Sequence, residues 1–286
     1  MNNPACKQRA FCTSALLMFL LSSQLLAADV RSDDITFNSH DVQLSGTVVY
    51  PLNQTGHVAA VFVHGSGPQK RNLPLARALA AKGIVTLVYD KRGVGESGGT
   101  YEGKQRVSEH NVNLLAADAA AALQVLRQHP QAQAVPAGLI GISQAGWLIP
   151  LAAEQEPRPD FMVIWSGPVS KVSEEDIYSR YTRDLDGAEV PSYEEALRAR
   201  KTPYVWPDFL GKDSNPVDSL KQLQVPGLWV FGAQDGSIPV DLSVRRLKAL
   251  AKQGHPYEYV LFSSLGHNNI SETLSTVTDW VKRLVK

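Results

Sequence analysis

The sequence has 286 residues, with 28 Lys or Arg balanced by 28 Asp or Glu. This balance excludes the strongly basic proteins that bind nucleic acids and the basic surfaces that bind anionic membranes. The length and a hydrophobic fraction of 44% are enough for one large domain with a substantial core.

The first 28 residues have the pattern of a secretory signal peptide. Two basic residues precede an apolar run (15–21), and small residues end the segment. The run is shorter than the roughly 20 apolar residues of a membrane-spanning helix, so we expect cleavage after Ala27 or Ala28 and no stable membrane insertion afterwards. The predicted organisation is a signal peptide over 1–28 and one large domain over 29–286.

Both cysteines, Cys6 and Cys12, lie inside the predicted signal peptide. The exported chain would therefore contain no thiol and no disulfide. Neither cysteine follows the end of the segment, so the sequence does not suggest a lipid-anchored protein. We expect an exported protein, periplasmic or secreted, that depends on its core for stability.

Strand and helix patterns alternate along the rest of the chain. Alternating apolar residues around a polar turn predict an antiparallel hairpin over 34–50. Continuous apolar runs, typical of strands buried on both faces of a parallel sheet, occur at 58–63, 84–89, 137–142, 161–165, 227–231 and 256–262. Helical spacing predicts helices at 73–82, 107–129, 147–152 and 271–285. The prediction is an α/β fold with a mostly parallel, doubly wound sheet and an antiparallel N-terminal hairpin.

The segment 166–226 interrupts this alternation. It is rich in charge, tyrosine and tryptophan, and it is long for a connection between two strands. We predict a partly helical lid or cap. The alternative is a surface excursion that has no contact with substrate.

A candidate nucleophile, Ser143, lies between a predicted strand and a predicted helix in the motif Gly141-Ile-Ser-Gln-Ala145-Gly146. This is the sequence form of a nucleophile elbow, in which the serine backbone is strained and its neighbours two residues away must be small. Ala145 stands where the commonest pattern has a second glycine.

Serine needs a base within hydrogen-bonding reach and a third group that orients the base. Asp235 is the candidate acid because it follows a strand at the carboxyl edge of the sheet. His267 is the candidate base because it lies beyond the acid, on the loop between the last strand and the last helix. The acids weighed against Asp235 are Asp213, Asp218 and Asp241.

The negative oxygen of a tetrahedral intermediate needs backbone N–H donors. We expect one donor from Gln144, which follows the nucleophile at a helix start. The second is expected from Ser66, in the flexible stretch His64-Gly-Ser-Gly67 after the strand at 58–63. His64 itself is expected to brace this loop rather than to transfer protons.

Two glycine-rich stretches have weaker interpretations as phosphate or dinucleotide sites. Residues 65–67 lack the Lys-Ser/Thr that a P-loop requires. The spacing Gly93-x-Gly95-x-x-Gly98 follows a strand, but no helix is predicted at its third glycine. Asp90 and Arg92 are instead expected to pin this turn by hydrogen bonds.

The chain resembles the α/β-hydrolase superfamily in four motifs taken together. These are His64-Gly-Ser-Gly-Pro, Tyr89-Asp-Lys-Arg-Gly-Val-Gly-x-Ser, the serine motif and the late Gly266-His267. The chain is most similar to serine esterases related to dienelactone hydrolases and prolyl-oligopeptidase-like domains, over roughly 40–285. The resemblance implies Ser143 as nucleophile, His267 as general base and then acid, and Asp235 as the group that orients the base. Peptidases of that branch favour a second glycine where this chain has Ala145, which favours an esterase.

We therefore expect a serine hydrolase that cleaves carboxylic esters of small molecules through an acyl-enzyme, without a metal or a cofactor. The first alternative is a serine peptidase or amidase, in which the acidic run Glu174-Glu175-Asp176 would anchor a substrate amine rather than form a solvated face. The second is a noncatalytic binding domain of the same fold.

Overall fold

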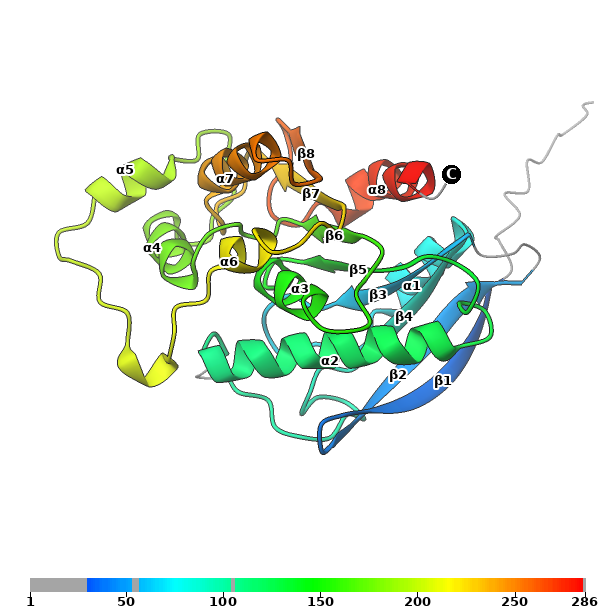
Figure 1. Cartoon of the computed structure of the whole chain (residues 1–286). Coiled ribbons are helices and arrows are strands. Elements are labelled where there is room, and N and C mark those ends of the chain that lie inside the picture. Colours follow the sequence, from blue (N-terminus) through cyan, green and yellow to red (C-terminus); the bar gives the residue numbers. More distant parts are fainter. Residues whose placement is uncertain (1–29, 53–56, 104–105, 285–286) are drawn as a thin grey trace, which may run out of the picture.

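The computed structural model describes residues 30–52, 57–103 and 106–284 (Figure 1). The predicted signal peptide and both cysteines lie outside the described residues. Within the described ranges, no helix is long and apolar enough to cross a membrane.

A single eight-stranded sheet, in the order β1-β2-β4-β3-β5-β6-β7-β8, forms the centre of the described chain. β1 pairs antiparallel with β2, β2 pairs antiparallel with β4, and each later pair is parallel. The strands are β1 (Val30–Ser39), β2 (Val42–Pro51), β3 (Val58–Val63), β4 (Ile84–Tyr89), β5 (Ala137–Ile142), β6 (Met162–Trp165), β7 (Gly227–Gly232) and β8 (Tyr257–Phe262). The predicted antiparallel hairpin and mostly parallel sheet are confirmed, although the hairpin extends further at its N-terminal end.

Helices connect most of the strands. They are α1 (Leu73–Ala81), α2 (Glu109–Gln128), α3 (Ala145–Ala153), α4 (Val172–Thr182), α5 (Tyr193–Arg198), the 3-10 turn η1 (Asp208–Leu210), α6 (Pro216–Leu220), α7 (Val240–Lys252) and α8 (Ile270–Leu284). The long helix starts two residues later than predicted because the Ser108 side chain accepts a hydrogen bond from the Asn111 backbone N–H and acts as N-cap. It ends before Pro130, which cannot continue a helix.

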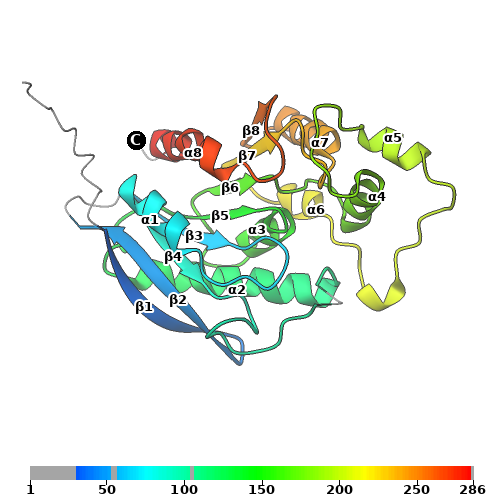
Figure 2. The ribbon, with the colours of Figure 1, turned by 180° about the vertical axis from the view of Figure 1, so that it is seen from behind.

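The helices cover both faces of the sheet (Figures 1 and 2). Alternate strand residues serve the two faces: Val61 packs in the cluster that includes α2 and α3, whereas Phe62 packs in the cluster that includes α1 and α8. Burial on both faces explains why these strands are continuously apolar, since each such side chain contributes about 1.5–3 kcal/mol when it leaves water.

The segment between β6 and β7 contains α4, α5, η1 and α6, as the prediction of a partly helical segment requires. It extends beyond the carboxyl ends of the parallel strands (Figure 1). Ligands bind at this edge in doubly wound sheets.

Candidate active site

Ser143 occupies the sharp turn between β5 and α3. Its φ of 57° lies in the left-handed region, and its backbone N–H donates to the Trp165 carbonyl at 2.9 Å. A side chain at Gly141 would place its Cβ 2.5 Å from the Ala145 Cβ and 2.7 Å from the Val63 carbonyl oxygen. The close approach explains why the motif needs a glycine before the serine and a small residue after it.

Asp235 follows β7 and is completely buried. Its Oδ1 accepts backbone N–H groups from Ser237 at 2.8 Å and Ile238 at 3.1 Å. The other carboxylate oxygen, Oδ2, lies 2.9 Å from His267 Nδ1. The backbone therefore fixes the carboxylate in an orientation that leaves one oxygen for the histidine.

His267 lies between the acid and the serine. Its Nε2 is 3.1 Å from Ser143 Oγ, although the two residues are 124 positions apart in the sequence. Burial disfavours the charged ring, but the hydrogen bond and charge of Asp235 outweigh it, with further contributions from Asp186 and Asp184, and raise the pKa of His267 above 6.5. The structure thus joins the three predicted side chains in one hydrogen-bonded chain.

The competing acids are occupied elsewhere. Asp213 accepts hydrogen bonds from the backbone N–H and hydroxyl of Ser173, at the start of α4. Asp241 accepts from the Tyr193 backbone N–H and pairs with Arg245. Asp218 lies near Asn215 and Lys212. None of these acids has a contact with His267 among the described residues.

The ring of His64 is packed in the core and does not take part in the hydrogen-bonded chain of Asp235, His267 and Ser143. Its ring is buried and packs edge-on against Tyr89, with 4.7 Å between the ring centroids. Burial, and then the charge of Lys91, lower the pKa of His64 to about 3. A ring that stays neutral and packed agrees with the predicted bracing role.

Both residues predicted to supply oxyanion donors adjoin the nucleophile. Gln144 is buried at the N-cap of α3. Ser66 lines the same cavity as Ser143 and His267. A Cβ placed on Gly65 would lie 3.4 Å from the Ser143 Cβ, so the loop after β3 passes close to the serine.

The hydroxyl of Ser143 faces a cavity of about 370 Å³. The segment 166–226 supplies one of its walls. Residues of this segment that line it include Val172, Glu175, Asp176, Ser179, Arg180, Asp184, Tyr204, Trp206, Pro207 and Leu210. The segment thus lies beside Ser143, and its role as a lid or cap stays a prediction.

Asp186, in the same segment, contacts the loops of Asp235 and His267 and was not singled out from the sequence. Its Oδ1 accepts the Gly236 backbone N–H and its Oδ2 accepts the His267 backbone N–H, both at 2.9 Å. One carboxylate therefore ties the loop of the acid to the loop of the base. No local motif marks Asp186 among the many charges of the segment.

We expect Asp186→Asn to lower kcat/KM roughly two- to tenfold, because an exposed hydrogen bond contributes about 0.5–1.5 kcal/mol. The substitution also removes a negative charge that raises the pKa of His267. Since the histidine must be neutral to accept a proton, the acid limb of the kcat/KM profile should move to lower pH. A pH–rate profile checks this, and an unmoved limb would contradict the electrostatic role.

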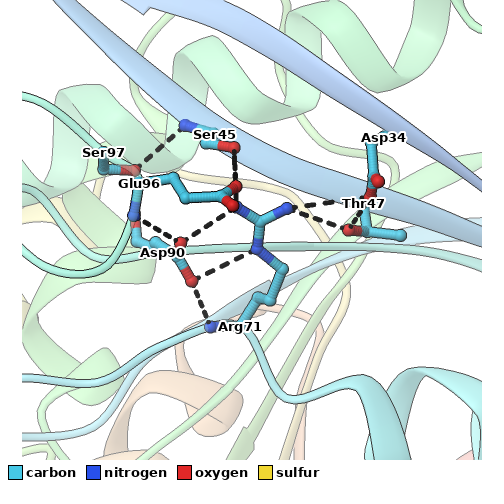
Figure 3. Close-up of polar contacts among 7 residues, drawn as sticks. All are labelled: Asp34, Ser45, Thr47, Arg71, Asp90, Glu96 and Ser97. Atoms are coloured by element: carbon cyan, nitrogen blue, oxygen red, sulfur yellow. Dashed lines mark hydrogen bonds and ion pairs between the residues drawn. The ribbon is translucent and has the colours of Figure 1, made fainter.

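The turn after β4 is held by a polar network around Asp90 (Figure 3). The Asp90 carboxylate accepts from the Arg71 backbone N–H at 2.8 Å, the Arg71 guanidinium at 2.9 Å and the Glu96 backbone N–H at 2.9 Å. A Cβ on Gly95 would lie 2.4 Å from Asp90 Oδ2, so this glycine serves the turn rather than a dinucleotide. Asp90 pins its turn as predicted, whereas Arg92 ties the turn to Asp118 of α2.

No group of three or more His, Cys, Asp or Glu side chains in the described ranges is arranged to hold a metal ion.

Comparisons with solved structures show which fold this arrangement has. An esterase of Pyrococcus furiosus, Pf2001, superposes with a TM-score of 0.65 and 19% identity over 90% of this chain and 94% of its own. An acylaminoacyl peptidase of Pyrococcus horikoshii superposes with a TM-score of 0.64 and 21% identity over 90% of this chain and 42% of its own. The predicted α/β-hydrolase fold is confirmed.

Sequence comparisons identify the family. Esterase EstD of Thermotoga maritima is 26% identical over 279 residues, which cover 87% of this chain and 63% of the relative. The chain thus spans less than two thirds of the length of that curated relative. The model of the prolyl oligopeptidase family matches residues 74–286, which include the serine, the acid and the histidine. The chain belongs to the prolyl oligopeptidase family, within the α/β-hydrolase superfamily.

Proposed function

We propose that this protein is a serine hydrolase that cleaves carboxylic esters of small molecules through an acyl-enzyme. The observation that carries the proposal is the chain Asp235–His267–Ser143, with separations of 2.9 and 3.1 Å, beside a cavity of about 370 Å³. The similarity to two proteins named esterases, EstD and Pf2001, supports an ester substrate.

In the proposed mechanism, Ser143 Oγ attacks the ester carbonyl while His267 Nε2 takes its proton. The protonated histidine then gives that proton to the departing alcohol, which leaves an acyl group on Ser143. Water, deprotonated by the same nitrogen, attacks the acyl group, and the proton returns to Ser143 as the acid departs. Asp235 stabilises the imidazolium throughout and keeps Nδ1–H directed away from the serine.

The developing oxyanion would accept hydrogen bonds from the backbone N–H groups of Gln144 and Ser66. Each such donor is worth about 2.7–4 kcal/mol of barrier. The N-terminal end of α3 also favours negative charge at this position.

The purified full-length chain tests the proposal with p-nitrophenyl esters of short carboxylic acids. We expect release of p-nitrophenol well above the buffer rate, with a pre-steady-state burst whenever deacylation is slower than acylation. A folded protein that gives no release above buffer from any acyl chain would contradict the proposal.

A specific observation favours a second class of substrate, esters or amides that carry an amine. Within the acidic run at the start of α4, Glu174 forms a bidentate pair with Arg246, and Asp176 contacts Arg180 and Tyr204. Glu175, between them, lines the cavity of Ser143 together with Asp176, but it has no ion-pair partner among the described residues. Burial, followed by the charges of Asp176 and Asp184, raises the pKa of Glu175 to about 8.

We expect the wild type to prefer a p-nitrophenyl ester with a terminal ammonium over its neutral alkyl isostere, and the preference to grow between pH 7 and 9. Glu175 becomes negatively charged as the pH rises through its pKa, whereas the substrate ammonium stays protonated. A gain of roughly three- to fivefold corresponds to about 1 kcal/mol. The ratio of the two kcat/KM values cancels the titration of the catalytic groups.

Glu175→Gln should remove this growth of the ratio, whereas Glu194→Gln, at an exposed position of α5, should preserve it. A wild-type ratio that is independent of pH would rule out recognition of an amine by Glu175.

A further inference from the structure

Lys91 is a buried cation beneath the loop after β3, and the proposed mechanism does not use it. Its side chain is 2% exposed. Its Nζ donates to the Gly65 carbonyl at 2.8 Å, the Gly67 carbonyl at 3.2 Å and the Gln144 Oε1 at 2.8 Å. An ammonium has three N–H donors and no acceptor, so these three oxygens match its full capacity.

The three acceptors belong to the two segments that carry the proposed oxyanion donors. The Gly65 carbonyl and the Ser66 N–H are opposite ends of one planar trans peptide group. Holding the carbonyl oxygen on the Lys91 side therefore directs the Ser66 N–H to the other side. The remaining acceptor is the side-chain Oε1 of Gln144, the residue whose backbone N–H is the other proposed donor.

The flanks of Lys91 are themselves immobilised. Asp90 on one side is held by Arg71 and by the Glu96 backbone (Figure 3). Arg92 on the other side pairs with the buried Asp118. The Lys91 backbone N–H also donates to the Gln69 carbonyl at 3.0 Å. With the Gly65 and Gly67 carbonyls, this is the third hydrogen bond from Lys91 to the segment after β3.

We propose that Lys91 is a positioning residue whose ammonium orients the backbone N–H groups of Ser66 and Gln144 toward the developing oxyanion. The inference rests on the proposed hydrolase function. Lys91 acts on Ser66 through the carbonyl of the shared peptide group and on Gln144 through its side-chain amide oxygen, and it has no role in proton transfer.

The charge state of Lys91 gives the proposal a pH signature. A neutral amine has two N–H donors and a lone pair, so it would leave one of the three oxygens without a donor. Burial, and then the positive charge of Arg106, lower the pKa of Lys91 to about 8. The other ionisable groups near it do not compensate, because His64 is neutral and the Asp90 carboxylate faces Arg71. We expect kcat to fall on the alkaline side as Lys91 loses its proton.

The test compares Lys91→Met and Lys91→Arg with Lys82→Met, a matched control at an exposed position after α1. For Lys91→Met we expect kcat for a p-nitrophenyl ester to fall by about 10²–10³-fold, the effect of losing one oxyanion donor, with little change in KM. Affinity for a trifluoromethyl ketone, whose adduct with Ser143 carries an oxyanion, should fall by a similar factor. The control should match the wild type in both measurements.

Lys91→Arg keeps a charged donor group at all accessible pH values, so its kcat should lack the alkaline limb that the wild type shows. If Lys91→Met does not fold, two measurements still test the positioning role of Lys91. They are the pH profile of kcat for Lys91→Arg and the pH dependence of ketone affinity in the wild type. Folding is checked for each variant by circular dichroism and thermal unfolding.

A folded Lys91→Met enzyme with wild-type kcat and wild-type ketone affinity would overturn the positioning role alone, provided that Ser143→Ala is inactive. An alkaline limb of the wild-type kcat that persists unchanged in Lys91→Arg would also overturn it. If Ser143→Ala is as active as the wild type, the proposed hydrolase function itself is wrong. The positioning role of Lys91, which rests on that function, is then wrong as well.

Discussion

Replacing Ser143 with alanine should lower kcat for p-nitrophenyl ester hydrolysis by about 10⁶-fold, the effect of removing the nucleophile of a serine hydrolase. The Oγ, 3.1 Å from His267 Nε2, is the atom that would carry the acyl group. Alanine keeps the Cβ and leaves the packing between Gly141 and Ala145 intact, so the melting temperature should change little.

Steady-state kinetics at several protein concentrations measure this effect. Ser179→Ala is a matched control because Ser179 lines the same cavity from α4 without a contact to the histidine among the described residues. It should retain wild-type kcat within a few-fold. Equal activity in Ser143→Ala and the wild type would dismiss Ser143 as the nucleophile.

Asp235→Asn is expected to lower kcat by about 10⁴-fold, because the amide selects the wrong tautomer of the histidine. The carboxylate Oδ1 accepts two backbone N–H groups, so the carbonyl oxygen of asparagine should take that position. Its NH₂ group then faces His267 Nδ1 and donates to it. The ring proton moves to Nε2, where it points at Ser143 and prevents the ring from acting as a base.

The same substitution removes the hydrogen bond and charge that raise the pKa of His267, so any residual activity should extend to lower pH than in the wild type. Asp218→Asn provides the control, since Asp218 is exposed near Lys212 and away from the proposed site. Loss of less than tenfold in kcat for Asp235→Asn would mean that Asp235 does not orient the base.

The sheet and the central site were predictable because their signals are local. Strands buried on both faces must be apolar throughout, and the interior strands β3, β4 and β5 have the predicted bounds. The elbow was predictable because steric crowding between Gly141 and Ala145 restricts the residue types at two positions close to the serine in the sequence. Asp235 and His267 followed from their place after strands that end at one edge of the sheet.

The roles of Asp186, Lys91 and Glu175 were not predictable in the same way, because they depend on contacts between segments that are distant in the sequence. Asp186 lies 81 residues from His267 and shares its segment with many other acids. Lys91 contacts carbonyls 26 and 24 residues away and a side chain 53 residues away. Glu174 pairs with Arg246 and Asp176 accepts a hydrogen bond from Tyr204, and these tertiary contacts distinguish the two acids from Glu175.

Labelling of the folded wild type with a fluorophosphonate tests the central claim most directly, because the reagent reacts with a serine that a neighbouring base has activated. We predict one adduct per chain, located on Ser143 by peptide mass spectrometry, and none after denaturation or in a folded His267→Ala variant. An adduct on another serine, or a folded wild type that takes up no label, would contradict the claim that His267 and Asp235 make the Ser143 hydroxyl reactive.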